Sequence, residues 1–179
     1  YRLEIDCCPP QILQKHNFFG HANMLDYSNA VFDMQTEKYG LHVGADQKDE
    51  WRTGQVGITL AHLTGNFFCP PLTQLPIIDA IDKNNRKKKH RDIESCVSLG
   101  FTERRRSNYH GVTVYHKGML LEQEWKKPGR LRRELIDLGN RSIRVEVKLF
   151  SKTLNELGLN YVMRWENCDV QALFFKILA

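Results

Sequence analysis

The hydrophobic and polar positions along the chain predict a mixture of strands and helices. Strands are indicated where apolar and polar residues alternate or where β-branched and aromatic residues gather, at 1–7, 56–68, 95–101, 109–117 and 142–150. Helices are expected where apolar residues recur at helical spacing or where helix start and stop signals bound a segment, at 75–81, 130–138, 151–157 and 170–178. The strands at 95–101 and 109–117 are predicted to pair through a basic turn at 103–108.

Other segments carry mixed signals. Cys8-Pro9-Pro10 ends the first strand, after which 12–13 begin a helix or turn and 15–21 form a loop. Residues 29–39 fit a short helix or an irregular strand, 119–125 a strand or a helix, and 86–91 a solvated basic helix end or loop. Because strands and helices mix without regular βαβ alternation, we predict an α+β fold with a central antiparallel sheet flanked by helices.

Composition makes this a folded, basic protein. The 179 residues are 41% hydrophobic, enough for a core in one compact domain spanning 1–179 or in two small lobes. Lysine and arginine number 26 against 21 acidic residues, which gives a formal charge of +5. Polyanions are therefore expected partners.

The sequence argues against several classes of protein. The five cysteines form no CxxC pair, and no apolar run approaches the length of a membrane span. We therefore expect reduced cysteines, an intracellular chain and no membrane partner. Phosphate-binding GxxxxGK[ST], dinucleotide-binding GxGxxG and GxSxG hydrolase patterns are absent from the sequence, as is a zinc-finger pattern. The chain opens on Tyr1 in a strand-like pattern, so we expect a fragment of a longer protein.

Tyr115 is the candidate nucleophile. Covalent cleavage of a phosphodiester needs a nucleophile for phosphorus and cations for the nonbridging oxygens. In Val114-Tyr115-His116-Lys117 a tyrosine near the end of an apolar strand precedes a lysine, which would stabilise a tyrosinate or a phosphate oxygen. Tyr109 is the competing nucleophile, and an ordinary strand tyrosine is the alternative for either residue.

Glu4, His62 and Glu146 are the candidate metal ligands. Glu146 shares a strand face with Arg144 and Lys148, and a solvated face explains this pattern equally well. The same alternative applies to Glu4. His62 interrupts an apolar strand, where a buried histidine needs a hydrogen-bond partner or a metal. A mixed histidine and carboxylate set favours Mg²⁺ or Mn²⁺ over structural zinc.

Basic clusters supply candidate DNA contacts. They lie at 86–91, at Arg104, Arg105 and Arg106, and at 126–133. Tyr109 is among the aromatic residues available to stack on unpaired bases. Each cluster alone is also typical of solvated surface charge. Two of them flank the Tyr109–Tyr115 strand in sequence, which favours a DNA path along it.

The order of four segments resembles the replication initiators of filamentous phages, the gene II and gene X protein family. The most specific segment is 3–20, where a strand, prolines, a helix and the turn His16-Asn17-Phe18-Phe19-Gly20 follow one another. The others are 58–68, 110–122 with Tyr115, and 144–159 with Glu146. His16 and Asn17 thereby join the candidate DNA-binding residues.

The resemblance implies a site-specific endonuclease in a bacterial host cytoplasm. Such an enzyme nicks single-stranded or origin DNA, stays linked to the 5′ phosphate through Tyr115, leaves a 3′ hydroxyl for rolling-circle synthesis and rejoins ends. Host helicase and polymerase would be further partners. Leu60 and His62 stand where the family has a basic residue and an aspartate, although His62-Leu63-Thr64 is similar to the histidine motif of the HUH endonuclease class. A non-catalytic DNA-binding relative and a basic structural or RNA-binding domain are the alternatives.

Overall fold

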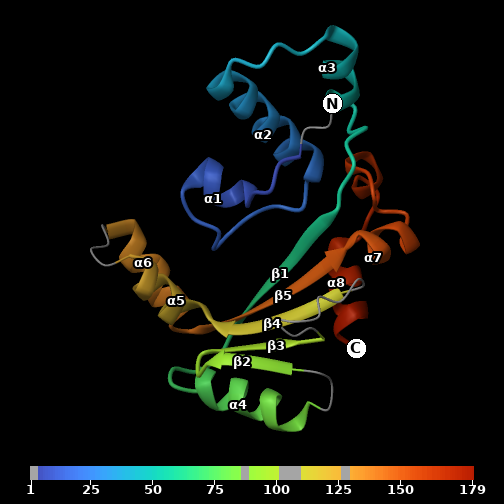
Figure 1. The fold of residues 1–179 in the computed structure, drawn as a ribbon. Helices are drawn as coiled ribbons and strands as arrows, with labels where there is room; N and C mark the ends of the chain where they lie inside the picture. The colour runs from blue at the N-terminus through green and yellow to red at the C-terminus, as the bar shows by residue number, and fades with distance from the viewer. Residues whose placement is uncertain (1–3, 86–88, 101–109, 126–129) are drawn as a thin grey trace. The chain divides into compact units, whose positions relative to one another are not determined.

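The computed structural model describes residues 4–85, 89–100, 110–125 and 130–179 (Figure 1). The chain divides into two compact units, each made of separate stretches of sequence. Unit 1 contains residues 1–59 and 154–170, and unit 2 contains residues 60–153 and 171–179.

Unit 2 is built on an antiparallel sheet of five strands in the order β1-β5-β4-β3-β2. The strands are β1 (Leu60–Phe68), β2 (Lys89–Ile93), β3 (Cys96–Leu99), β4 (His110–His116) and β5 (Ser142–Phe150). The predicted pairing of β3 with β4 is confirmed, and β5 lies between β4 and β1. With its flanking helices the sheet gives the predicted α+β fold.

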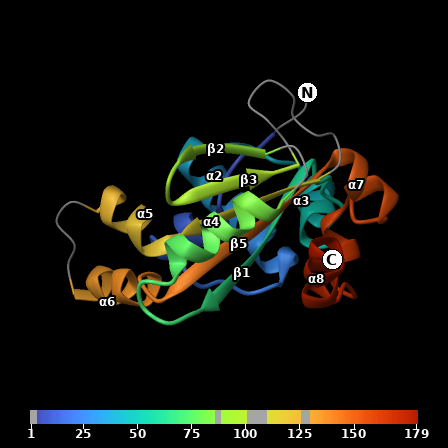
Figure 2. The same ribbon diagram turned by 90° about the horizontal axis from the view of Figure 1, so that it is seen from below.

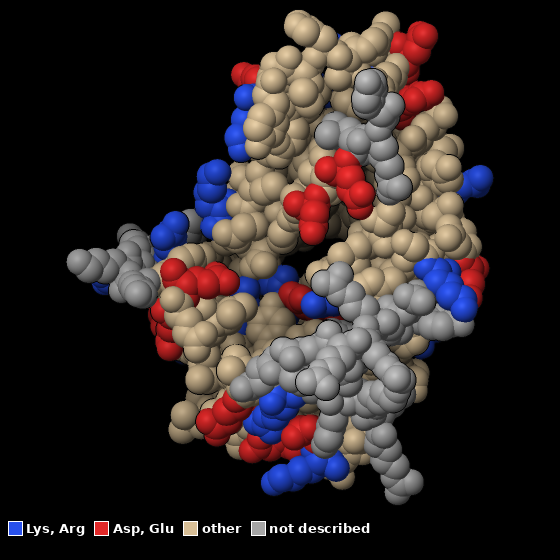
Figure 3. Space-filling model, viewed as in Figure 1, with Lys and Arg blue, Asp and Glu red and all other residues tan. Residues whose placement is uncertain are grey.

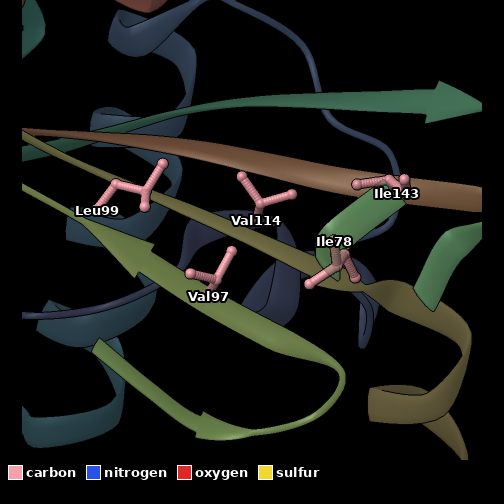
Figure 4. Close-up of a cluster of buried hydrophobic side chains, with 5 residues drawn as sticks. All are labelled: Ile78, Val97, Leu99, Val114 and Ile143. Atoms are coloured by element: carbon pink, nitrogen blue, oxygen red, sulfur yellow. The ribbon is translucent and has the colours of Figure 1, made fainter. Parts of the chain in front are cut away.

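One face of the sheet forms the hydrophobic core of unit 2. Helix α4 (Gln74–Asn84) lies against this face (Figures 1 and 2). Its apolar positions recur at helical spacing, as predicted, and Ile78 is fully buried. Figure 4 shows Ile78 with the strand residues that complete the cluster, namely Val97, Leu99, Val114 and Ile143. Full burial of one such side chain contributes roughly 1.5–3 kcal/mol.

Two helices lie between the central strands β4 and β5 in the sequence, at one end of the sheet. They are α5 (Lys117–Glu124) and α6 (Arg130–Gly139). Gly118 and Gly139 lie where α5 and α6 meet, and a Cβ added to Gly139 would lie 2.7 Å from the Gly118 nitrogen. A side chain larger than hydrogen would therefore separate the two helices at the first turn of α5.

The remaining C-terminal elements agree with the sequence pattern. Helix α7 (Ser151–Glu156) follows β5 directly, and Gly158 beyond it has a positive φ of 68°. Helix α8 (Val170–Leu178) brings Phe174 against the sheet, where a Cβ on Gly65 would meet its ring at 3.0 Å. No helix in the described part of the chain is both long enough and apolar enough for a membrane span.

Unit 1 is helical. It contains α1 (Pro9–Gln14), α2 (Met24–Tyr39), α3 (Ala45–Arg52) and a 3₁₀ helix at Val162–Trp165. The Asn23 side chain caps α2 by accepting hydrogen bonds from the backbone of Leu25 and Asp26. Phe32 of α2 stacks on Trp51 of α3 at 4.3 Å between ring centroids, which joins these helices.

Three sequence-based expectations are wrong. Residues 4–7 form no strand; the chain enters α1 instead, with proline at its first positions, where a missing N–H costs nothing. Lys89 to Arg91 belong to β2 and not to a helix end or loop. The predicted strand at 56–68 begins only at Leu60, because Gly57 pairs with Tyr161 in an isolated bridge.

Candidate active site on the polar face of the sheet

The register of the sheet places five predicted or charged side chains on one face. Tyr115 of β4 lies opposite Arg144 of β5, and Glu146 lies two residues further along β5, on the same face. On the other side of β5, His62 of β1 lies opposite Lys148. The alternation that buries the apolar face of β5 therefore gathers these polar groups on the opposite face.

The Glu146 carboxylate is the centre of this cluster. The Tyr115 hydroxyl donates a hydrogen bond of 2.7 Å to its Oε1, and Arg144 Nε lies 3.2 Å from the same oxygen. The second oxygen, Oε2, lies 4.0 Å from His62 Nδ1. One carboxylate thus contacts side chains from three strands, and we call Tyr115, Arg144, Glu146 and His62 the Glu146 cluster.

Burial differs across the Glu146 cluster. Arg144 is 5% exposed and Tyr115 8%, whereas the His62 side chain is 42% exposed. The alternative of a solvated strand face is therefore wrong for Arg144 and Glu146. The expectation of a buried His62 is also wrong, because His62 alternates with the inward-facing Ala61 and Leu63. The cluster opens to solvent at His62.

The hydroxyl of Tyr115 is held in its protonated form. Burial raises the pKa of Tyr115 well above its ordinary value of 10, Arg144 opposes this shift, and the charge and hydrogen bond of Glu146 add to it. At neutral pH the hydroxyl therefore remains a donor to Glu146. A phosphorus-attacking Tyr115 would have to lose its proton during the attack, and Glu146 is its bonded acceptor.

Lys117 lies immediately after β4, at the start of α5. Its side chain is fully buried, and Nζ lies 5.9 Å from the centroid of the Tyr115 ring. The preceding residue, His116, caps α5, since its Nδ1 accepts a hydrogen bond from the Met119 backbone. Burial lowers the pKa of His116, which keeps this acceptor neutral. The Lys117 side chain is thus held close to the Tyr115 ring.

The structure does not bring every predicted residue to the Glu146 cluster. Glu4 precedes α1 and is exposed in unit 1, and His16 and Asn17 lie half-buried in the loop after α1, also in unit 1. Tyr109 and the turn Arg104 to Arg106 lie outside the described residues. It remains a prediction that Glu4 is a metal ligand. It also remains a prediction that Arg104, Arg105, Arg106 and Tyr109 contact DNA.

The side chains of the Glu146 cluster provide only part of a binding site for a divalent metal ion. His62 and Glu146 present an imidazole nitrogen and a carboxylate oxygen 4.0 Å apart, donors that Mn²⁺ accepts. Over the described ranges, no three His, Cys, Asp or Glu side chains converge as a metal site. His62 and Glu146 therefore form at most two of the ligands.

Arg144 is the site residue that sequence reasoning missed. In the sequence Arg144 shares one strand face with Glu146 and Lys148, a pattern that is also typical of solvated strands. Its position two residues before Glu146, and in register with Tyr115, is the signal that could have identified it.

Part of the expected basic surface is neutralised locally. Arg91 of β2 forms ion pairs with two carboxylates of α4, at 2.6 Å with Asp79 and 3.4 Å with Asp82. On the face shown in Figure 3, Lys and Arg side chains are interspersed with Asp and Glu. Arg91 is therefore a structural cation that ties β2 to α4.

The fold and the cluster together define an α+β protein with a tyrosine-centred polar site on one face of its sheet. The family model of the N-terminal part of the phage gene II replication-associated protein matches residues 1–168. The chain belongs to this family of phage replication initiators, and DNA is its partner. Comparison with curated proteins and with solved structures gives no match.

Proposed function

We propose that this initiator nicks one strand of origin DNA through a covalent bond to Tyr115. The observation that carries the proposal is the 2.7 Å hydrogen bond from the Tyr115 hydroxyl to Glu146. A nucleophile paired with a base within hydrogen-bond reach is the arrangement that covalent catalysis uses. The family membership supplies the substrate class, DNA.

The nicking reaction exchanges the bond from phosphorus to the 3′ oxygen for a bond from phosphorus to the Tyr115 oxygen. The Tyr115 oxygen attacks phosphorus, its proton passes to Glu146 Oε1, and the bond from phosphorus to the 3′ oxygen breaks. The 3′ oxygen takes up a proton from water and leaves as a hydroxyl, Glu146 returns its proton to the solvent, and the 5′ phosphate stays bonded to Tyr115. Attack of a 3′ hydroxyl on this phosphotyrosine reverses the steps and rejoins the strand. Arg144 and Lys117 are the buried basic side chains close to Tyr115.

A divalent ion would have two of its ligands in this cluster. His62 and Glu146 would supply these two ligands to Mg²⁺ or Mn²⁺. The ion would neutralise charge on the nonbridging oxygens of the phosphate.

One observation favours a second candidate function, DNA binding without cleavage. Tyr115 is only 8% exposed, and its raised pKa keeps the hydroxyl protonated. In a binding-only protein, the hydrogen bond to Glu146 would simply satisfy a buried hydroxyl.

A covalent-adduct assay separates these functions. The protein is incubated with a labelled single strand carrying the phage origin and Mn²⁺, and adducts that survive denaturation are counted. We expect Tyr115→Phe to abolish the adduct, because the ring is kept and the nucleophilic oxygen is lost. Glu146→Gln should slow adduct formation by about 10²–10⁴-fold through loss of the base.

Tyr109→Phe is the matched control and should leave the adduct intact. An adduct that persists in Tyr115→Phe but disappears in Tyr109→Phe would assign the nucleophile to Tyr109. Salt-sensitive binding with no adduct on any origin strand would establish the binding-only function.

A further inference from the structure

Unit 1 contains a ledge made by two segments far apart in the sequence. Residues 54–58 run beside 160–163, and Gly57 pairs with Tyr161 in a β-bridge. Backbone hydrogen bonds of 2.8–3.0 Å join Ile58 to Asn160, Val162 to Val56 and Met163 to Gly54. Hydrogen bonds at Asn160 and Val162 therefore fix the backbone on both sides of Tyr161, and Met163 is held by its own backbone N–H.

Gly54 makes this close pairing feasible. Its φ is +75°, and a Cβ at this position would lie 2.8 Å from the Met163 nitrogen. Only glycine tolerates both the conformation and the approach. Val162 and Trp165, each 4% exposed, anchor the other segment in the interior of unit 1. The two segments of the ledge are thus held in place by the packing of unit 1.

The ledge bears an open depression of about 370 Å³, lined by Glu50, Gln55, Tyr161, Met163 and Arg164. Two large apolar side chains face solvent here, with Tyr161 45% and Met163 43% exposed. An aromatic ring and a polarisable thioether held on rigid backbone give a flat apolar ligand a surface to stack on.

The rim of the depression is charged. Neither the Arg164 guanidinium nor the Glu50 carboxylate forms an ion pair with another residue that the structure describes. Gln55 donates one hydrogen bond, of 3.3 Å, to the Thr53 hydroxyl. The lining therefore combines an aromatic face, a cation suited to phosphate and a carboxylate that can accept a hydrogen bond from an N–H group on the edge of a base.

We propose that this depression binds one unpaired nucleotide of single-stranded DNA, with the base stacked on Tyr161, Arg164 at the adjoining phosphate and Glu50 at the base edge. An unpaired base fits because a paired base is already stacked and its edge is occupied. The inference rests on DNA as the partner of the family and is independent of the nicking chemistry of Tyr115.

The test measures affinity for a labelled oligodeoxythymidine of about 12 nucleotides in EDTA, where cleavage does not contribute. Tyr161→Ala should weaken binding by about 5- to 150-fold, whereas Tyr161→Phe should bind like the unaltered protein because the ring is kept. The control is Tyr39→Ala, which removes a 62% exposed tyrosine of unit 1 whose ring lies beneath Lys38. It should change affinity little.

An abasic oligonucleotide of the same length separates stacking from backbone contact. Its affinity should be the same for the unaltered protein and for Tyr161→Ala. Equal affinity of Tyr161→Ala and the unaltered protein for oligodeoxythymidine would overturn the proposal. So would a loss seen equally with the abasic strand, or a change of oligomeric state in Tyr161→Ala without a change in DNA affinity. None of these outcomes depends on whether Tyr115 forms an adduct.

Discussion

At the scale of single residues, the two oxygens of Glu146 face different partners. Oε1 receives the Tyr115 hydroxyl and lies 3.2 Å from Arg144, while Oε2 faces His62 at 4.0 Å. Arg144 thereby fixes the oxygen that accepts from Tyr115 and leaves the other turned toward the exposed histidine. A guanidinium whose Nε contacts the carboxylate holds this orientation better than a flexible ammonium would.

Loss of Arg144 should therefore cost stability. Arg144→Met leaves the Glu146 charge buried without its closest cation, and removal of one partner from a buried pair costs about 3–5 kcal/mol. We expect a fall of about 3 kcal/mol in the free energy of unfolding, measured by urea denaturation. Arg144→Lys should recover part of the loss.

The matched control is Arg52→Met, which breaks an exposed pair. Arg52 and Asp33 approach to 2.7 Å, but their side chains are 55% and 59% exposed, so the expected cost is under about 1 kcal/mol. Equal losses in the two variants would show that Arg144 contributes no more than a surface charge.

The sequence identified Tyr115, Lys117, His62 and Glu146 as candidates but did not identify Arg144. Alternation along 142–150 distinguishes the apolar face of the strand from its polar face. It does not show whether other residues cover the polar face. Burial of Arg144 at 5% depends on what packs over β5, which a single strand pattern does not contain. The exposure of His62 escaped prediction for the same reason.

At the scale of elements, α5 begins at a cap that titrates. His116 Nδ1 accepts a hydrogen bond from Met119 at 3.2 Å, and only the neutral imidazole has this acceptor. Burial lowers the pKa of His116 below its ordinary 6.5. The stabilisation is therefore complete above about pH 6.5 and is lost as the pH falls toward the folded-state pKa.

His116→Asn should remove this pH dependence. Asparagine is a good helix cap and does not titrate, so the variant should keep α5 while losing the acid sensitivity. Between about pH 7 and pH 5, we expect the unaltered protein to lose about 1 kcal/mol more of its free energy of unfolding than the variant. Urea midpoints at the two pH values measure this difference.

His42→Asn is the control, because His42 is exposed in unit 1 and caps no helix. It should show the same pH dependence as the unaltered protein. If His116→Asn retains the full acid sensitivity, the titrating cap lies elsewhere.

The elements with strong periodicity were predictable, and those set by tertiary context were not. β5, α6 and α8 lie close to their predicted bounds. Helix α3 was not predicted because Ala45–Arg52 is almost entirely polar and shows no apolar stripe. The strand expected at 1–7 does not form over residues 4–7, because an alternating pattern needs a partner strand to become a ladder.

At the scale of the whole molecule, DNA affinity should depend on salt. The chain has a formal charge of +5. If each net charge displaces one counterion from a single strand, the logarithm of the association constant should fall with the logarithm of salt concentration with a slope of roughly −3.5. Fluorescence anisotropy with labelled oligodeoxythymidine over a series of KCl concentrations measures the slope, and a slope near zero would contradict electrostatic binding.

Unit 1 is made of two stretches of sequence that residues 60–153 separate, and this arrangement affects how the chain folds during synthesis. Unit 1 needs residues 154–170 to complete the packing of residues 1–59, so all of 60–153 must be made first. At ordinary translation rates this delay is roughly 5–20 s. During that interval α2 lacks the Val162–Trp165 segment against which it packs. Residues 1–59 thus leave the ribosome before the sheet but complete their packing after most of it, and until then they stay accessible to chaperones and proteases.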